Sequence, residues 1–416
     1  MRFCVLLLSA FLALFGNVLA IAAEPAGEWP QFLGPNRNGS SSETGLIDAW
    51  PEGGPKELWR AKGGIGMAGL AISRGKLLTM AQREGQQKLI ALDAESGEPQ
   101  WETDIAPAYR NQMGDGPRGT PTIAGDQVFV YTGEGILAAV QFSDGKLLWS
   151  HNVVKELKGE QADYGMACSP LVVAGQVIVT AGAPQAAVVA YDAKSGKLAW
   201  TAGDALAGYS SPALLDVGGR EQIVAFTGGA VLGLEPGKGN QLWRFDYETE
   251  FGCNIATPVA YKGQVFVSAG ENHGSALIGL KNTNAGFETN EVWSSLGTKS
   301  VLRTEWQTAI LLGDHLYGFD NVGAAGPVSH LTCIHAQTGE RAWQQLRFGK
   351  GNMIAADGKL FISTMKGELV IARASPKAYE EIGRGEFVGM TRQAPALLNG
   401  LLYLRDDKEI LCLDVA

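Results

Sequence analysis

The stretch YDAKSGKLAW (191–200) contains the pattern that decides the fold, a polar turn with glycine placed four residues before tryptophan. The same spacing returns in LDAESGEPQW (92–101), QFSDGKLLW (141–149), LEPGKGNQLW (234–243) and IHAQTGERAW (334–343). Aspartate, serine or threonine near glycine is typical of a hairpin turn, because the short side chain bonds nearby backbone and glycine adopts the positive φ of the reversal. Each copy predicts two antiparallel strands, of which the second carries the tryptophan.

Two further strands precede each of these hairpins. They are visible in TPTIAGDQVFVYTG (120–133), SPLVVAGQVIVTAG (169–182) and TPVAYKGQVFVSAG (257–270), each with a Ser/Thr-Pro start, an apolar run, a glycine-centred turn and a run rich in valine or phenylalanine. Proline fits at the start because the first residue of a strand need not donate to the sheet. One repeat is therefore predicted to be four antiparallel strands.

Seven tryptophans recur at intervals of 42 to 51 residues. A period of this length is typical of repeat proteins in which each unit is one small sheet. We expect these side chains to be structural and to bury a large area between neighbouring units. They are Trp59, Trp101, Trp149, Trp200, Trp243, Trp293 and Trp343.

The number of units predicts the architecture. We place repeats near 67–104, 117–152, 164–203, 208–246, 253–296, 303–347, 351–384 and 386–416. The seventh has no tryptophan, and AYEEIGR (378–384) is predicted as its fourth strand. The last has three strand patterns and stops at ILCLDVA (410–416), while ELWRAK (57–62) precedes the first complete repeat. We therefore predict an all-β, eight-bladed β-propeller over 57–416 whose C-terminal blade is completed by an N-terminal strand, which removes exposed sheet edges.

Composition agrees with this architecture. The chain has 55 glycines and 19% charged residues, and no helical period of 3.6 continues outside the N-terminus. These features favour a turn-rich, all-β domain. The net charge of −9 argues against nucleic acid or an anionic membrane as the main partner. We expect a monomer.

The N-terminus indicates export. Arg2 precedes the apolar run FCVLLLSAFLALFGNVLAIAA (3–23), and Ala20-Ile21-Ala22 is suited to a small-residue cleavage site. We predict a signal peptide over 1–23, a lead-in segment over 24–56, and a periplasmic or secreted protein with no membrane segment after cleavage. An uncleaved membrane anchor is the alternative.

Four cysteines remain after the signal peptide is removed: Cys168, Cys253, Cys333 and Cys412. An even number in an exported chain is compatible with disulfides. However, the repeat places Cys333 and Cys412 on third strands of units six and eight, and the other two near first strands of units three and five. No natural pair falls in neighbouring blades, and a disulfide needs Cα atoms within about 7 Å. We predict buried free thiols.

The repeat AYDAKSGKLAW (190–200), with its SPLVVAGQVIV start (169–179), resembles the quinoprotein-type, or PQQ-like, β-propeller repeat. The resemblance covers nearly the whole chain after the signal peptide. The segments WPQFLGPNRNG (29–39) and GLIDAWPEGGPKELW (45–59) resemble the lead-in of exported PQQ-like propeller proteins of bacteria. A repeat type indicates fold more firmly than function.

The resemblance implies two classes of function. In PQQ-dependent alcohol or sugar dehydrogenases the quinone lies in the central funnel over a tryptophan floor, with calcium polarising its carbonyl and an aspartate as base. Other members are non-catalytic, such as the barrel-assembly subunit of the outer membrane, and bind proteins or peptides on one face. This chain lacks the vicinal cysteine pair of the alcohol dehydrogenases, and its short units leave little length for a substrate pocket.

We therefore predict a non-catalytic binding or scaffold propeller that recognises an envelope or extracellular protein, a peptide or a glycan through its top face or central funnel. A PQQ-dependent dehydrogenase, with PQQ and calcium as cofactors, is the alternative. The sequence predicts no metal site of its own. The five histidines show no HxH or HExxH spacing, which argues against zinc.

Candidate ligand-binding residues are found in the loops that lead into the first strand of each blade, because these loops converge at one end of the channel. Arginine offers forked donors, and aromatic faces stack on sugars or peptides. The alternative is that these side chains fill the channel together with trapped water. The candidates are Arg118, Tyr164, Tyr209, Asn254, Arg303, Glu305, Trp306, Asn352 and Arg392.

Two details refine this set. RTEWQ (303–307) replaces the usual small Ser/Thr-Pro start, so Arg303, Glu305 and Trp306 form the best single cluster. Glu305 is the only carboxylate of the nine candidates, although Asp115, Asp163 and Glu250 lie in the same loops. His273 and the pair Asp320-Asn321 are predicted to lie in solvated loops between second and third strands.

Overall fold

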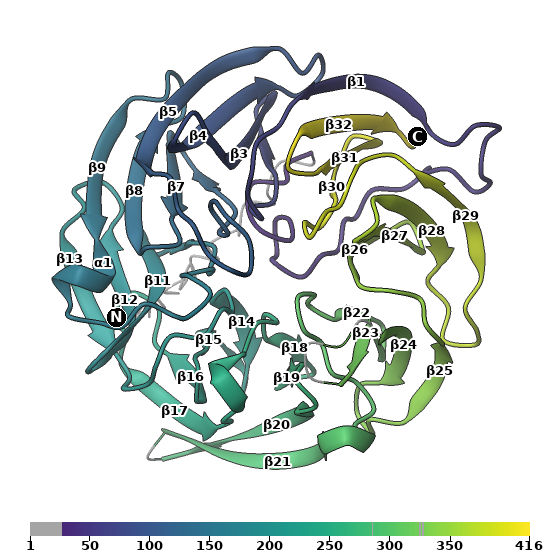
Figure 1. Ribbon diagram of the computed structural model, residues 1–416. Helices are drawn as coiled ribbons and strands as arrows, with labels where there is room; N and C mark the ends of the chain where they lie inside the picture. The colour runs from purple at the N-terminus through teal and green to yellow at the C-terminus, as the bar shows by residue number, and fades with distance from the viewer. Residues whose placement is uncertain (1–26, 285, 324–325, 327) are drawn as a thin grey trace, which may run out of the picture.

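The computed structural model describes residues 27–284, 286–323, 326 and 328–416. It contains eight separate four-stranded antiparallel sheets, arranged as blades around a central channel (Figure 1). Seven blades are built from four consecutive strands, and the eighth has the order β1-β32-β31-β30. The predicted eight-bladed propeller is confirmed. The predicted signal peptide lies outside the described residues.

The first four blades follow the chain in order. Blade 1 consists of β2 (Ala71–Ser73), β3 (Lys76–Arg83), β4 (Gln86–Asp93) and β5 (Pro99–Pro107). Blade 2 consists of β6 (Thr122–Ala124), β7 (Gln127–Tyr131), β8 (Ile136–Gln141) and β9 (Leu147–Asn152). Blade 3 consists of β10 (Leu171–Val173), β11 (Gln176–Ala183), β12 (Ala186–Asp192) and β13 (Leu198–Ala202). Blade 4 consists of β14 (Ala213–Val217), β15 (Arg220–Phe226), β16 (Ala230–Leu234) and β17 (Gln241–Asp246).

The remaining blades close the ring. Blade 5 consists of β18 (Val259–Tyr261), β19 (Gln264–Ala269), β20 (Gly274–Thr283) and β21 (Gly286–Leu296). Blade 6 consists of β22 (Ile310–Leu312), β23 (His315–Val322), β24 (Val328–His335) and β25 (Arg341–Gln345). Blade 7 consists of β26 (Gly351–Ala356), β27 (Lys359–Thr364), β28 (Glu368–Arg373) and β29 (Glu381–Glu386). Blade 8 consists of β30 (Ala396–Leu398), β31 (Leu401–Arg405), β32 (Glu409–Asp414) and β1 (Lys56–Lys62).

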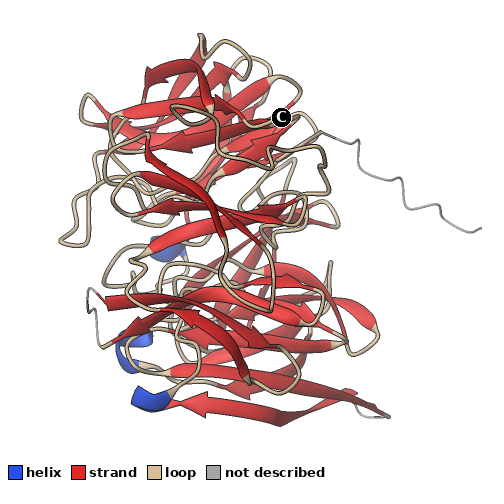
Figure 2. Ribbon diagram, turned by 90° about the vertical axis from the view of Figure 1, so that its right-hand side faces the viewer, coloured by secondary structure: helices blue, strands red, loops and turns tan. Residues whose placement is uncertain are grey.

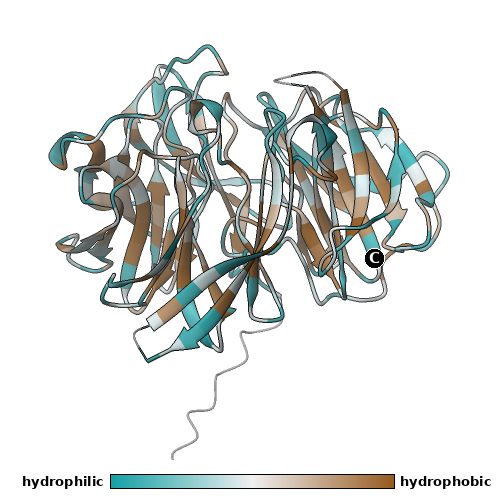
Figure 3. Ribbon diagram, turned by 90° about the horizontal axis from the view of Figure 1, so that it is seen from below, coloured by the Kyte–Doolittle hydropathy of each residue, from teal (hydrophilic) through white to brown (hydrophobic). Residues whose placement is uncertain are grey.

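The helical elements among the described residues are single turns: α1 (Val153–Glu156), η1 (Glu250–Gly252) and η2 (Gly297–Lys299). Figure 2 shows the ring from the side, with strands as its main content. No helix among the described residues is long and apolar enough to cross a membrane. The hydrophobic residues gather within the blades (Figure 3), because the first three strands of each blade are largely buried while the fourth alternates between partly buried and exposed side chains.

Ring closure joins the two ends of the described chain. Strand β1 pairs antiparallel with β32, and Trp59 lies opposite Cys412 (Figure 1). Arg405, at the end of β31, is 1% exposed and extends into blade 1, where its Nη1 donates to Met80 O (2.9 Å) and to Thr79 Oγ1 (2.6 Å). A buried guanidinium satisfied by acceptors of the neighbouring blade holds the eighth blade against the first.

The tryptophan and the glycine of the repeat interlock between blades. Five of the seven repeat indoles pack on the turn glycine of the next blade: for example, a Cβ added to Gly97 would lie 2.6 Å from the Trp59 ring, and one added to Gly239 would lie 2.3 Å from Trp200. Both glycines also have positive φ, +74° and +73°. The Trp59 Nε1 donates to Ala94 O in the same turn (3.1 Å). Glycine is therefore required both for the turn and for the space that the indole occupies.

Blade 7 lacks its own tryptophan, and the lead-in supplies one. In β29, Gly383 pairs with Ile371, the register position that Trp343 has opposite Cys333 in blade 6. Trp50 of the lead-in fills the space, because a Cβ on Gly383 would lie 2.2 Å from its ring. The predicted fourth strand over 378–384 begins later, at Glu381, which sets Gly383 in this register.

The four cysteines are buried and free, as predicted. Cys333 and Cys412 lie on the third strands of blades 6 and 8, and the other two precede first strands. Burial raises the pKa of Cys253 to about 11 and that of Cys333 to about 12. A thiol that stays protonated at neutral pH is a poor nucleophile, so these residues are part of the packing.

Candidate functional site

The two ends of the channel differ because the strands of each blade alternate in direction. All connections from the fourth strand of one blade to the first strand of the next lie on one face, which we call the upper face. The turns between third and fourth strands lie on the opposite, lower face. Eight of the nine predicted ligand-binding residues belong to connections on the upper face, and the ninth, Asn352, is the second residue of β26.

A plug segment, residues 29–41, crosses the lower part of the channel. It pairs with first strands through backbone hydrogen bonds: the Trp29 N–H donates to Ile72 O (2.8 Å), and Trp29 O accepts from the Ile72 N–H (2.7 Å). Pro30 O accepts from Ile123 N–H (2.8 Å), and on the far side of the ring Gly39 O accepts from Ala355 N–H (2.8 Å). The plug segment therefore links blades 1, 2 and 7.

Arg37 fixes the plug segment to blade 3. Its Nη1 donates to Pro170 O and to Gln31 Oε1, both at 2.8 Å, and its Nη2 donates to Ser169 O at 2.8 Å. The side chain is 4% exposed, and burial lowers the pKa of Arg37 to about 10. It remains charged at neutral pH, and its hydrogen bonds are made within the channel wall.

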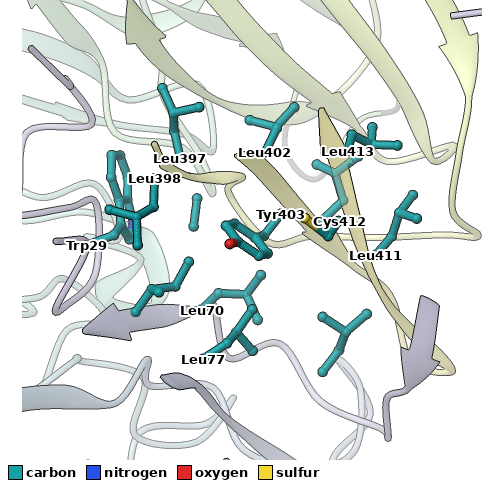
Figure 4. Close-up of a cluster of buried hydrophobic side chains, with 14 of the residues drawn as sticks. Trp29, Leu70, Leu77, Leu397, Leu398, Leu402, Tyr403, Leu411, Cys412 and Leu413 are labelled. Atoms are coloured by element: carbon teal, nitrogen blue, oxygen red, sulfur yellow. The ribbon is translucent and has the colours of Figure 1, made fainter. Parts of the chain in front are cut away.

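Trp29 joins the plug segment to the hydrophobic core. It is 2% exposed and belongs to the apolar cluster of Leu70, Leu397 and Leu398 at the junction of blades 1 and 8. Figure 4 shows its ring next to Leu398. The lower end of the channel is thus closed by buried apolar packing as well as by backbone hydrogen bonds.

Above the plug segment lies a cavity of about 160 Å³. Trp29, Phe32 and Leu33 of the plug segment line it, together with residues from the upper connections. Among the described residues, no aspartate or glutamate lines this cavity. Six of the nine predicted residues do so: Arg118, Tyr164, Tyr209, Trp306, Asn352 and Arg392.

Two arginines give the cavity its charge. Arg118 donates from Nε to Tyr164 O and from Nη2 to Gly114 O, both at 2.7 Å, so it is held by backbone carbonyls. Arg392 donates from Nη1 to Met113 O. Burial lowers the pKa of Arg118 and that of Arg392, and nearby acidic groups, among them Asp115 for Arg118 and Asp407 for Arg392, oppose part of the shift. Among the described residues no carboxylate lines the cavity itself, so these opposing charges lie outside it.

Trp306 lies between cations of neighbouring blades. The Arg392 Cζ is 4.8 Å from the centre of its ring, and the Lys350 Nζ is 4.3 Å away. Such distances allow a cation–π contact with the indole face. Lys350 is also paired with Glu305 (2.6 Å), whereas Arg392 makes no ion pair within the described chain. Arg392 is therefore the cation best placed to accept an anion.

Tyrosines form the wall on the side of blades 3 and 4. The rings of Tyr164 and Tyr209 stack with centres 5.7 Å apart, and Tyr209 Oη accepts from the Tyr164 N–H (3.3 Å). Burial raises the pKa of both phenols, so they are neutral at physiological pH. They supply flat apolar surface together with hydroxyl groups.

Three predicted residues lie behind the cavity wall. Asn254 donates from Nδ2 to Thr227 O (2.7 Å) and to Tyr247 O (3.1 Å) and thereby holds blade 4 connections together. Glu305 is buried in the pair with Lys350; burial raises its pKa, and Lys350 partly opposes this shift. Arg303 is 4% exposed and forms a buried ion pair.

Asp320 is the ion-pair partner of Arg303, and its position differs from the solvated loop predicted for Asp320-Asn321. These residues are 1% and 3% exposed and belong to β23, so a solvated loop is wrong for them. Asp320 Oδ1 and Oδ2 accept from Arg303 Nε (2.7 Å) and Nη2 (2.9 Å), which satisfies the carboxylate. His273 is half-buried against the ring of Tyr247 (4.6 Å), not fully solvated as predicted.

The floor of the cavity was absent from the sequence prediction. Trp29, Phe32 and Leu33 come from WPQFL (29–33) in the lead-in. Four of these five residues are apolar although no strand pattern includes them, and this is the feature of the sequence that indicates a buried segment. Within the described residues, no group of three or more His, Cys, Asp or Glu side chains is arranged to hold a metal ion.

Comparison with known proteins identifies similar chains. A family profile described as "Outer membrane protein assembly factor BamB" matches residues 44–156 and 85–345. A quinohemoprotein alcohol dehydrogenase from Comamonas testosteroni has a similar fold, with a TM-score of 0.68 and 14% identity over 94% of this chain and 80% of that one. BamB from Moraxella catarrhalis gives 0.56 and 16% over 83% of this chain and 93% of that one.

A shorter match joins the chain to a curated enzyme. It is 34% identical over 138 residues to quinohemoprotein alcohol dehydrogenase ADH IIB of Pseudomonas putida, which is 30% of this chain. The match spans 19% of that relative's length. At their low identity the two solved structures show a common fold and nothing finer.

Proposed function

The chain belongs to the PQQ-like β-propeller repeat family, and from this premise we propose that it is an exported, non-catalytic binding or scaffold module. Its partner is an envelope or extracellular protein, a peptide or a glycan. The partner contacts the upper face and places an acidic group in the channel cavity.

The observation that carries this proposal is the charge of the cavity. Arg118 and Arg392 line it, and no carboxylate does so among the described residues; Asp115 and Asp407 lie with Arg392 along the adjoining smaller hollow instead. Burial disfavours the charged form of both guanidinium groups, and an anion inside the cavity favours it. Arginine also binds a carboxylate with two parallel hydrogen bonds. An acidic ligand is therefore complementary to this site.

The family description supports a scaffold role. The matching profile is named for an assembly factor of outer membrane proteins, and a solved structure bearing the same name shares the fold. On the upper face the turns between second and third strands are short, whereas most connections that lead to the cavity are longer. The surface available for recognition is therefore concentrated at the mouth of the channel.

The quinoprotein alternative requires oxygen ligands for a calcium ion in the cavity. Calcium takes six to eight oxygen ligands, including carboxylates. The described cavity lining offers no carboxylate. Glu305, the one carboxylate among the predicted ligand-binding residues, forms an ion pair with Lys350. The vicinal cysteines of the alcohol dehydrogenases are absent from the sequence. These residues do not fit PQQ held with calcium, so no oxidation step is assigned to the chain.

Benzoate is a suitable probe, because it combines a carboxylate with an aromatic ring and is small. Calorimetric titration should detect weak binding of benzoate to the wild-type chain, and Arg392→Met should weaken it about tenfold or more by removing the forked donor. Arg244→Met, on the exposed face of β17, is the matched control and should leave binding unchanged.

Two results would overturn the proposal. One is equal benzoate binding by the wild-type and Arg392→Met chains, with both chains folded by circular dichroism. The other is a bound quinone chromophore after addition of PQQ and calcium, together with dye-linked oxidation of an alcohol or sugar. The second result would establish the dehydrogenase alternative.

A further inference from the structure

Exposed apolar side chains gather on the upper face. Leu206, Phe251, Leu346 and Met390 are 61% to 64% exposed, the highest values among large apolar side chains of the described residues. All four lie in connections from the fourth strand of one blade to the first strand of the next. We call these four residues the apolar rim. Exposed apolar groups concentrated on one face indicate a contact surface for another molecule.

The apolar rim surrounds the cavity. Each of its members stands two to six residues before a cavity-lining residue, which lies in the same connection or, after Leu346, at Asn352 in the following strand β26. Leu206 precedes Tyr209, and Met390 precedes Arg392. Met390 also lines a smaller hollow beside the main cavity, together with Arg392, Asp115 and Asp407. At Met390 the rim and the cavity therefore share a residue, Arg392, and elsewhere the chain leads from one to the other.

Phe251 is held outward by its backbone. Its φ is +61°, a left-handed conformation that is unfavourable for a bulky side chain. The following residue, Gly252, packs near Gly228, and Gly228 N–H donates to Leu206 O (2.9 Å). Leu206 and Phe251 are thus fixed on either side of a small glycine turn. A strained backbone that presents an aromatic ring to solvent is consistent with a binding role.

The guanidinium group of Arg392 has N–H donors that remain available to a ligand in the cavity. A guanidinium has five N–H groups. The Nη1 of Arg392 donates to Met113 O, whereas its Nε and Nη2 make no hydrogen bond within the described chain. These two nitrogens form the edge that grips a carboxylate with two parallel hydrogen bonds. Arg118, in contrast, has its donors engaged by backbone carbonyls.

We propose that the upper face binds an extended segment of a partner protein, in which one glutamate or aspartate is flanked by bulky apolar side chains. The carboxylate reaches Arg392 in the cavity, and the flanking side chains contact the apolar rim. This inference rests on the proposed function and narrows it. A glycan or a small acid supplies the anion but has no apolar side chains for Leu206 and Phe251, whereas a peptide supplies both.

The test uses mixtures of short fluorescein-labelled peptides. In the parent mixture a central glutamate is fixed, its neighbours are leucine, isoleucine, phenylalanine or methionine, and the outer positions are random. A second mixture replaces glutamate by glutamine, and a third replaces the apolar neighbours by serine. Fluorescence anisotropy with the wild-type chain should show binding of the parent, about tenfold weaker for either replacement.

Variants on the protein separate rim from cavity. Leu206→Ser with Phe251→Ser should weaken the parent mixture about tenfold and leave benzoate binding unchanged. Leu198→Ser, at a position that is 50% exposed on the outer strand β13, is the control and should change neither. All these side chains are exposed, so the variants should melt close to the wild-type temperature.

Each outcome is decisive. If benzoate binds but the parent and serine mixtures bind equally, or no peptide binds, the segment proposal is overturned while the proposed function stands. Equal peptide binding by the Leu206/Phe251 variant overturns the rim. If neither benzoate nor any peptide binds, both proposals are overturned.

Discussion

The lower and upper ends of the channel are built from the same residue types and differ in what those residues contact. At the lower end, Trp29 is 2% exposed and Arg37 donates to three acceptors of the chain itself. At the upper end, Trp306 and Arg392 line an open cavity, and part of the Arg392 donor edge is unused. The same residue types are packed and hydrogen-bonded at the lower end and line open space at the upper end, where we propose that they contact a ligand.

The difference comes from the plug segment. Eight blades alone enclose a tube, and a tube binds poorly because it does not exclude water from either end. The plug segment closes one end with apolar side chains and turns the tube into a cup whose floor is Trp29, Phe32 and Leu33. A cup with a dry floor strengthens the electrostatic pull of the arginines on an anion.

The largest expected contrast is between the two tryptophans. Trp29→Ala removes a fully packed indole and should lower the free energy of unfolding by about 3–5 kcal/mol. Trp306→Ala, at the open end, should lower it by about 1 kcal/mol or less, since the ring is partly exposed. Urea unfolding measures both. Equal losses would show that the floor and the mouth do not differ in packing.

The two arginines, Arg37 and Arg392, should differ in how much their hydrogen bonds contribute to stability. Arg37→Met keeps the apolar stem but leaves Ser169 O buried without its donor, at a cost of about 1–3 kcal/mol, while Pro170 O keeps the hydrogen bond from Thr122 Oγ1. Arg392→Met should cost much less, because the cation it removes is only partly buried and makes no ion pair among the described residues. Thermal melting of the two variants at one pH tests this order; a larger loss for Arg392→Met would contradict it.

Salt should separate the ends without any mutation. Anion binding at the upper cavity depends on Arg392 and should weaken as ionic strength rises from about 0.05 M to 0.5 M, because exposed charges are screened. Stability carried by the lower end should change little, since the plug segment is held by buried contacts. Benzoate titration and thermal melting over the same salt series provide the comparison. Salt-independent benzoate binding would place the probe outside the charged cavity.

The smallest expected effect concerns pH. Burial lowers the pKa of His273 from its ordinary value of 6.5. The folded chain therefore binds this proton less readily than the unfolded chain, so the stability contributed by neutral His273 is full above about pH 6.5 and is lost as pH falls through the folded pKa. His273→Gln should lose less melting temperature than wild type between pH 7 and pH 5. An identical fall in both chains would contradict this assignment.

The fold was predictable because its signal is local and repeated. The glycine four residues before tryptophan encodes a turn, and the same glycine makes room for the preceding blade's indole, so one motif determines both hairpin and blade packing. Ring closure followed from the vacant strand in the last repeat. The predicted positions of the cysteines followed from the same register.

The site was less predictable, because it depends on partners from other blades. The repeat identifies which connections reach the channel, and six candidates do line the cavity. It does not reveal that Arg303 turns to Asp320 or that Glu305 turns to Lys350, since each pair is set by side-chain direction. The position of the plug segment could not be predicted for a related reason. Its hydrogen bond from Ala355 N–H to Gly39 O joins residues from opposite ends of the chain.

The lead-in also has a consequence for the order in which the molecule can form. Residues 29–47 are the first described part of the chain to be synthesised, yet Gly39 bonds Ala355 and Ile47 bonds Val415 (2.9 Å). Such contacts between distant residues form late, because the intervening chain must be ordered first. The plug segment can contact blades 1 to 3 early, through its bonds to Ile72, Ile123 and Pro170, but its bond to Ala355 and the closure of the ring by β1 and β32 must wait for the C-terminal blades. A chain cut short before β32 should therefore keep part of the plug contacts and lack a closed ring.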